Sequence, residues 1–230
     1  MPIGVLTNCA AVLLGGALGT LLGKILPESL KDYLPVLFGM CSIAIGINSI
    51  IKASNMTAVV LALLVGFTIG HLLNLEKWAS RFFHWLIKTC HLGNDHIDME
   101  FYITAVALFC CSGFGWYSTL TEGIAGDPSL LMAKSVLDCF TALIFASALG
   151  AAVCVIPLPQ CVILLLVFGA GRLLAPFLTP TMFADLSACG GILTMSAGFR
   201  VAKIKSLPLV DLMPALILIM PFSGLLSLIF

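Results

Sequence analysis

The sequence predicts an all-α polytopic membrane protein with about eight transmembrane helices, and three observations lead to this fold class. Of the 230 residues, 60% are hydrophobic and only 10% are charged. Apolar runs of about 20 residues, the length that crosses a bilayer, recur along the chain. Two early runs also align with two late runs, which indicates an internal repeat. Because a soluble domain carries about 25% charged residues, the composition excludes a water-exposed globule.

Charged residues and prolines interrupt the apolar runs and define the eight predicted spans. Charges bound the first four runs, whereas the stretch from Cys139 to Gly171 has no charge and is too long for one span. Pro157 and Pro159 divide it, because proline breaks helices. The predicted spans are 2–23, 33–51, 56–75, 101–121, 129–155, 160–178, 183–202 and 209–230. Seven spans with one re-entrant segment is the alternative.

The segment from Glu76 to His91 differs from the spans because it is amphipathic. Basic side chains and histidines follow one helical stripe, and aromatic side chains occupy the other side. The stripe consists of Lys77, Arg81, His84, Lys88 and His91, and the opposite side of Trp78, Phe82, Trp85 and Leu86. We expect a helix in the headgroup layer that anchors the orientation. An ordinary connector packed on the protein is the alternative.

An internal repeat organises the predicted domain. A shift of 152 positions aligns the first two spans with the sixth and seventh, and it superposes three glycines and the amides Asn8 and Gln160; Asn48 meets Arg200. Five spans separate the two units, so they cross the bilayer in opposite directions. Inverted repeats are typical of secondary transporters. The single membrane domain, 1–230, then divides into repeat unit one (about 1–75), the linker helix (76–91), central helices (about 99–155) and repeat unit two (about 158–230).

The distribution of basic residues predicts the orientation. With eight spans, eight of the eleven lysines and arginines fall on one face. The positive-inside bias places this face in the cytoplasm, and both termini outside it.

Five segments carry a resemblance to a known family: 6–11 with its following glycines, 126–127, 134–138, 148–150, and 190–191 before Gly198. On these residues the chain resembles the domain-of-unknown-function family 554 (DUF554) over nearly its whole length. The resemblance implies a bacterial inner-membrane protein of transporter type and leaves the substrate open.

Asp138 is the principal candidate for a binding site. Asp127-Pro128 predicts the start of the fifth span, so Asp138 lies about 16 Å deep, near the bilayer centre. Lys134 lies four residues earlier on the same face. Ionisable groups inside a membrane are costly and usually line a pathway, which favours a cation or proton site. A purely structural ion pair is the alternative.

Four polar residues complete the predicted site: Asn8, Asn48, Gln160 and Ser112. The first three come from the repeat. Ser112 precedes Gly113 and Gly115 in the middle of the fourth span, where two glycines weaken a helix. A break there would expose backbone carbonyls to a cavity. A continuous helix with two packing glycines is equally compatible with the sequence.

We therefore expect a secondary transporter that moves a small solute or ion by alternating access of its repeats. An ion channel or a non-transporting scaffold is the alternative; an enzyme, a cofactor and a resident metal are not expected. Cys90, His91, Asp95 and His96 lack a metal-ligand spacing. The partners are the solute and the lipid bilayer, and homo-oligomerisation is left open. Zero net charge argues against nucleic acid.

Overall fold

The computed structural model describes residues 1–23, 27–89, 99–110, 112–205 and 207–229, and within them the chain is helical and contains no strand. The helices are α1 (Ile3–Leu22), α2 (Glu28–Ile50), α3 (Met56–Leu72), α4 (Leu75–Thr89), α5 (Met99–Cys110), α6 (Gly113–Ala125), α7 (Ser129–Leu149), α8 (Pro157–Leu174), α9 (Pro180–Val201) and α10 (Pro214–Ile229). Three short 3-10 helices connect them: η1 (Gly150–Val155), η2 (Ala175–Phe177) and η3 (Val210–Leu212).

Five segments in the described residues are long and apolar enough to cross a membrane: Ile3–Leu22, Phe101–Ala125, Ser129–Val155, Pro180–Val201 and Val210–Ser227. A sixth is added if α3 and the start of α4, which are bent by 59° to each other, count as one broken span. The predicted second and sixth spans fall short, because their apolar parts are limited to Gly39–Ile50 and Pro157–Leu173. The helical, membrane-like fold class is confirmed, whereas eight spans stay a prediction.

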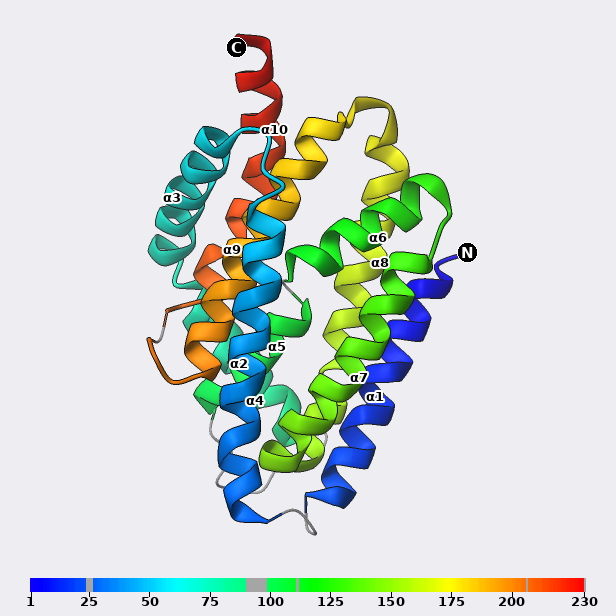
Figure 1. Ribbon diagram of the computed structural model, residues 1–230, viewed down its shortest axis with the longest axis vertical. Helices are drawn as coiled ribbons and strands as arrows, with labels where there is room; N and C mark the ends of the chain where they lie inside the picture. The colour runs from blue at the N-terminus through cyan, green and yellow to red at the C-terminus, as the bar shows by residue number, and fades with distance from the viewer. Residues whose placement is uncertain (24–26, 90–98, 111, 206, 230) are drawn as a thin grey trace.

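The first three and the last three long helices run in opposite senses. In Figure 1, α1 descends, α2 ascends and α3 descends, whereas α8 ascends, α9 descends and α10 ascends. Between them in sequence, α5 and α6 ascend and α7 descends. Apart from α5 and α6, which share one direction, these helices alternate in direction along the chain, as short connections between long helices require.

Glycines bring α1 against α7. A Cβ added at Gly15 would lie 2.1 Å from the carbonyl oxygen of Cys139, and one at Gly19 would lie 2.2 Å from that of Leu143. No side chain fits at these distances, so the two backbones are in direct contact. Gly15, Gly19 and Gly23 follow one another at four-residue intervals, the GxxxG spacing that is typical of close helix packing in membranes.

Glycines also bring α2 into close contact with α9. Added Cβ atoms at Gly39 and Gly46 would lie 2.7 and 2.6 Å from the carbonyl oxygens of Gly198 and Gly191, respectively. The reciprocal additions at Gly198 and Gly191 would lie 2.6 and 2.8 Å from the oxygens of Gly39 and Gly46. Two antiparallel helices thus approach at two glycine pairs.

The fourth predicted span is interrupted between α5 and α6. Ser112 is extended (φ −67°, ψ 131°) and its hydroxyl accepts a hydrogen bond from the backbone N–H of Gly115 at 3.0 Å. Ser112 is therefore the N-cap of α6. Of the two readings that the sequence left open, the structure has the break rather than a continuous helix.

The division between the fifth and sixth spans also falls where the prolines indicated. The α-helix of α7 ends at Leu149, because Gly150 has a positive φ of 66°, and η1 continues to Val155. Pro157 then begins α8, three residues before the predicted start at Gln160. Proline is favoured in a first helical turn, where its missing N–H would have no partner in any case.

The amphipathic segment forms α4, with its aromatic side exposed. Trp78 and Trp85 are 66% and 59% exposed, and Trp78 stacks on Phe82 with ring centroids 6.0 Å apart. Packing against the protein's own helices would have buried these rings. Residues 90 and 91, at the end of the predicted helix, lie outside the described residues, as does Lys24 from the orientation argument.

Candidate functional site

Four of the six predicted site residues form one connected cluster. Lys134 donates to Oδ2 of Asp138, and the two form an ion pair one turn apart on α7. Asn8 of α1 donates from Nδ2 to the same oxygen at 2.8 Å. Gln160 of α8 donates from Nε2 to Oδ1 of Asn8, also at 2.8 Å. Three helices thus contribute to one chain of hydrogen bonds that ends at the Asp138 carboxylate.

The cluster is closed to solvent. The exposed fractions are 0% for Asn8 and Gln160, 3% for Lys134 and 6% for Asp138. Asp138 lies about 14 Å along α7 from its first residue. A charge at this depth is tolerated because its counter-ion and an amide donor lie in contact with it.

Helix periodicity explains why these residues meet. Lys134 and Asp138 belong to the buried stripe of α7, which otherwise consists of small, hydroxyl or apolar residues. Asn8 lies on the buried stripe of α1, between the contact at Gly4 and the glycines that face α7. The tight α1–α7 interface therefore brings the amide of Asn8 to the carboxylate.

One acceptor of the cluster has no partner. Oε1 of Gln160 is buried and accepts no hydrogen bond from any described residue. An unsatisfied buried acceptor is costly, and a buried water, a proton donor or a cation would satisfy it. The cluster therefore has an open oxygen on Gln160, the residue that is linked to the charged pair through Asn8.

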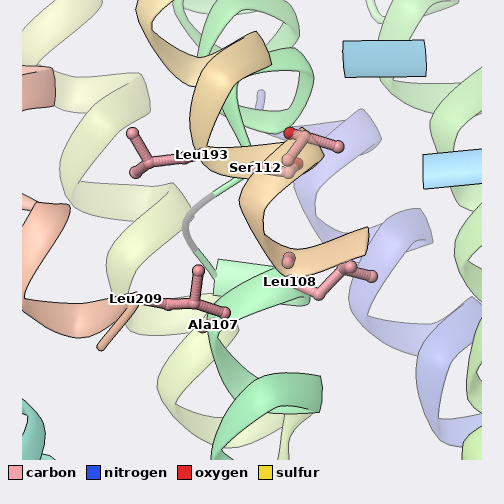
Figure 2. Close-up of a pocket in the computed structure, with 7 residues that line it drawn as sticks. Ala107, Leu108, Ser112, Leu193 and Leu209 are labelled. Carbon is pink, nitrogen blue, oxygen red and sulfur yellow. The ribbon is translucent and has the colours of Figure 1, made fainter. Parts of the chain in front are cut away.

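Ser112 lies near the cluster but is not bonded to it. Its hydroxyl and Cε of Lys134 are both 2.8 Å from the position of a Cβ added at Gly115, so that glycine makes room for the lysine. Ser112 also lines a cavity of about 10 Å³, room for about one water molecule. Figure 2 shows this cavity with Ser112 and its apolar neighbours, among them Leu108, Leu193 and Leu209.

Two described carbonyls at the break, those of Cys110 and Ser112, are already bonded. The indole Nε1 of Trp116 donates to the carbonyl oxygen of Cys110 at 2.9 Å, and its backbone N–H donates to that of Ser112 at 3.1 Å. The expected role of the break, to offer carbonyls to an ion, does not hold for these two oxygens in this conformation.

Asn48 does not join the cluster. It is exposed near the end of α2 and lines a separate cavity of about 760 Å³. The structure therefore divides the six predicted residues between a buried cluster, a helix cap beside it and an open cavity.

Sequence reasoning missed three buried carboxylates that cap helices. Glu122 accepts from the N–H of Gly4 at 2.7 Å. Asp185 accepts from the N–H groups of Ser54 and Asn55 at 2.9 and 2.7 Å, and from the hydroxyl of Ser223 at 2.6 Å. Each carboxylate satisfies free N–H groups at or just before the start of a helix, α1 or α3.

Asp211 is the third of these carboxylates. It accepts from the N–H of Glu76, at the start of α4, at 2.8 Å and lies 3.2 Å from Nδ1 of His71. Glu76 in turn forms an ion pair with Arg200. The sequence does indicate such a cap at α1. Because the start of α1 has no Ser, Thr, Asp or Asn, its free N–H groups need an acceptor from another part of the chain.

Among the described residues, no group of three or more His, Cys, Asp or Glu side chains could hold a metal ion. The segment that contains Cys90, His91, Asp95 and His96 lies outside the described residues.

The described residues form an apolar helical bundle that encloses a charged pair, which is the character of a membrane protein. The chain belongs to the family described as "Protein of unknown function (DUF554)", whose model matches residues 3–224. The family resemblance carried by the sequence motifs is thereby confirmed.

Two relatives extend this finding. The chain is 43% identical over 232 residues to "Uncharacterized protein YqgA" of Escherichia coli (strain K12), covering 97% of each chain. It is 25% identical over 223 residues to "Uncharacterized membrane protein YdfK" of Bacillus subtilis (strain 168), covering 94% of this chain and 93% of the relative. No solved structure matches the chain.

Proposed function

We propose that this protein is a secondary transporter of a small solute or ion in the bacterial inner membrane, and that the Lys134–Asp138 pair carries the charge used in transport. The observation that supports the proposal most strongly is the enclosed cluster of Asn8, Lys134, Asp138 and Gln160. A scaffold gains no stability from such a pair, because an apolar pair of the same size usually serves as well.

The contacts between helices support inverted repeats. Asn8 and Gln160 are equivalent in the repeat and are bonded directly to each other. In the repeat, Gly39 is equivalent to Gly191 and Gly46 is equivalent to Gly198. The repeat operation therefore turns the Gly39–Gly198 contact into the Gly46–Gly191 contact, and both are present. Reciprocal contacts of this kind are the mark of a two-fold axis between matching surfaces. The opposite senses of the two helix triplets agree with this arrangement (Figure 1).

The closed cluster favours transport over a channel. A channel needs a continuous polar path, whereas the four cluster side chains are buried and the cavity at Ser112 holds about one water molecule. A large cavity on one side of a closed charged pair is the arrangement expected of alternating access.

Uptake into proteoliposomes tests the transport proposal. Purified protein is reconstituted and screened with labelled metabolites and inorganic ions under an imposed pH or sodium gradient. The expected result is gradient-driven uptake of at least one solute by the wild-type protein and by Asp127→Asn, and none by Asp138→Asn. Asp127 is a matched control because it is an exposed aspartate just before α7. No uptake across the panel, or equal uptake by all three proteins, would contradict the proposal.

The proposed topology has eight spans with both termini outside the cytoplasm and α4 in the headgroup layer. The exposed tryptophans of α4 support the last point. A reporter that is active only in the cytoplasm, fused to the C-terminus, should be silent, while the same reporter inserted between α4 and α5 should be active. A bright C-terminal fusion would overturn this orientation.

A further inference from the structure

A cavity of about 760 Å³ lies where four helices end on one side of the molecule. This volume is within the range of sites for drug-sized ligands. The end of α2, the end of α6, the start of α7 and the start of α9 enclose it, and these ends lie in the upper half of Figure 1. The predicted topology places the same four ends on the outer face.

The only charge among the described residues that line the cavity is positive. Lys52 is the only charged residue that lines the cavity in the described part of the chain, and it forms no ion pair there. Nearby donors are the Asn48 amide and the Tyr117 hydroxyl. The acidic residues next to lining residues on these helices, Glu122, Asp138 and Asp185, are buried and bonded elsewhere. Asp127, exposed between α6 and α7, accepts hydrogen bonds from Ser129 and does not line the cavity. The polar part of the cavity therefore favours an anion.

The rest of the lining is apolar and partly aromatic. The ring of Tyr117 meets that of Phe183 edge to face, with centroids 6.0 Å apart and planes at 82°. Ile45, Leu130 and Leu137 extend this surface. Such a wall accepts a planar ring or an alkyl chain and gives a polar solute little to bind.

The cavity adjoins the charged cluster. Leu130 and Leu137 lie about one turn before and after Lys134 on α7, on the same face of the helix. Tyr117 follows Gly115, the residue that makes room for the lysine, by two positions. A molecule in the cavity thus lies beside the backbone that holds the ion pair.

We propose that this cavity binds a soluble monocarboxylate with an apolar body, with Lys52 as its charge partner, as the outward-facing substrate site. This inference names the substrate class of the transport proposed above and rests on that proposal. A two-chain phospholipid also has an anionic head and an apolar body, but it is larger than a drug-sized ligand. Bound lipid is therefore a competing outcome of the test.

Binding to purified protein in nanodiscs tests the inference with three ligands that share one body: 3-phenylpropionate, 3-phenylpropylamine and 3-phenylpropan-1-ol. Titration calorimetry should show the carboxylate binding at least about tenfold more tightly than the amine, with the alcohol between them. Lys52→Gln should weaken the carboxylate about three- to tenfold and leave the alcohol unchanged. The matched control Lys205→Gln, an exposed lysine after α9, should change neither.

A second variant tests the location. Ala184→Trp places an indole in the cavity and should abolish binding of all three compounds, with the unfolding midpoint measured in parallel. Equal affinity for 3-phenylpropionate and 3-phenylpropylamine, or wild-type affinity for the carboxylate in Lys52→Gln, would overturn the inference. So would native mass spectrometry that shows a co-purified phospholipid which 3-phenylpropionate does not displace. If the protein binds the carboxylate selectively but transports nothing in proteoliposomes, the transport proposal is contradicted and the binding site is not. If the protein transports other solutes in an Asp138-dependent way but does not prefer the carboxylate, the proposed substrate class is contradicted and transport is not.

Discussion

Asp138 and Asp185 are both buried aspartates on long apolar helices, but their partners differ in kind. Asp185 accepts hydrogen bonds from two backbone N–H groups and a serine hydroxyl. Asp138 accepts from a lysine ammonium and an asparagine amide. The first set can be satisfied by a neutral amide, whereas the second contains a full positive charge. Burial alone therefore does not separate the two aspartates; the charge of the partner does, and the transport proposal rests on that difference.

Replacement of each buried acid by its amide tests this comparison directly. Asp138→Asn should have the largest effect on transport. The change leaves the Lys134 ammonium buried without a counter-ion, a loss of about 3–5 kcal/mol. We expect transport per folded molecule to fall at least about a hundredfold because the negative charge used in transport is absent; this corresponds to a barrier higher by about 2.7 kcal/mol. Uptake in proteoliposomes, normalised to protein in the liposomes, measures it. Retained uptake would place Asp138 with the structural acids.

Asp185→Leu should instead act on stability. It removes the acceptor for Ser54 and Asn55 at the start of α3 and should cost about 3 kcal/mol. Asp185→Asn can keep all three bonds, with its oxygen toward the N–H groups and its nitrogen toward Ser223, and should be tolerated. Thermal unfolding in detergent compares the two variants. A larger loss of transport than of folded protein in Asp185→Asn would contradict a purely structural role.

The α1–α7 contact holds Asn8 at Asp138, so a change there should sharpen the comparison further. Gly15→Ala forces the helices apart, because its Cβ would lie 2.1 Å from the carbonyl oxygen of Cys139, and should cost about 2 kcal/mol. Gly169→Ala on α8 meets nothing within 4 Å and should be neutral or stabilising by up to about 1 kcal/mol. Unfolding midpoints of the two variants provide the measurement. Equal midpoints would mean that α1 and α7 pack less closely than described.

Glu122→Gln should have the smallest effect. Oε1 of Glu122 accepts from Gly4, while Oε2 is buried without a partner, so an amide can replace the carboxylate with little change. We expect a stability within about 0.5 kcal/mol of wild type and unchanged uptake. A loss of uptake here, with the fold intact, would extend the functional region from α7 to α6.

Much of the fold could be predicted because periodicity and hydropathy are local signals. The apolar runs located α1, α7, α9 and α10 closely, and Pro157 located the start of α8 within three residues. The number of membrane crossings could not be settled in the same way. The apolar parts of α2 and α8 are shorter than a span, and their crossing depends on how neighbouring helices shield their polar ends.

The site was predictable where one helix or one repeat supplied the information. Lys134 and Asp138 share a helical face, and the repeat paired Asn8 with Gln160. The repeat gave no comparable guide to Asn48, whose partner in the alignment, Arg200, bonds to Glu76 at 2.6 Å instead. Glu122 and Asp211 were missed because their roles depend on helix starts more than a hundred residues away.

The double replacement Lys134→Leu with Asp138→Leu tests the central claim most directly. Replacement of a buried ion pair by apolar residues of similar size is often neutral or stabilising, so the double variant should fold and insert like the wild-type protein. If the pair carries the charge used in transport, uptake by this variant in proteoliposomes should be absent although the protein is folded. Full uptake by the folded Leu–Leu variant would show that the pair is structural and would contradict the account.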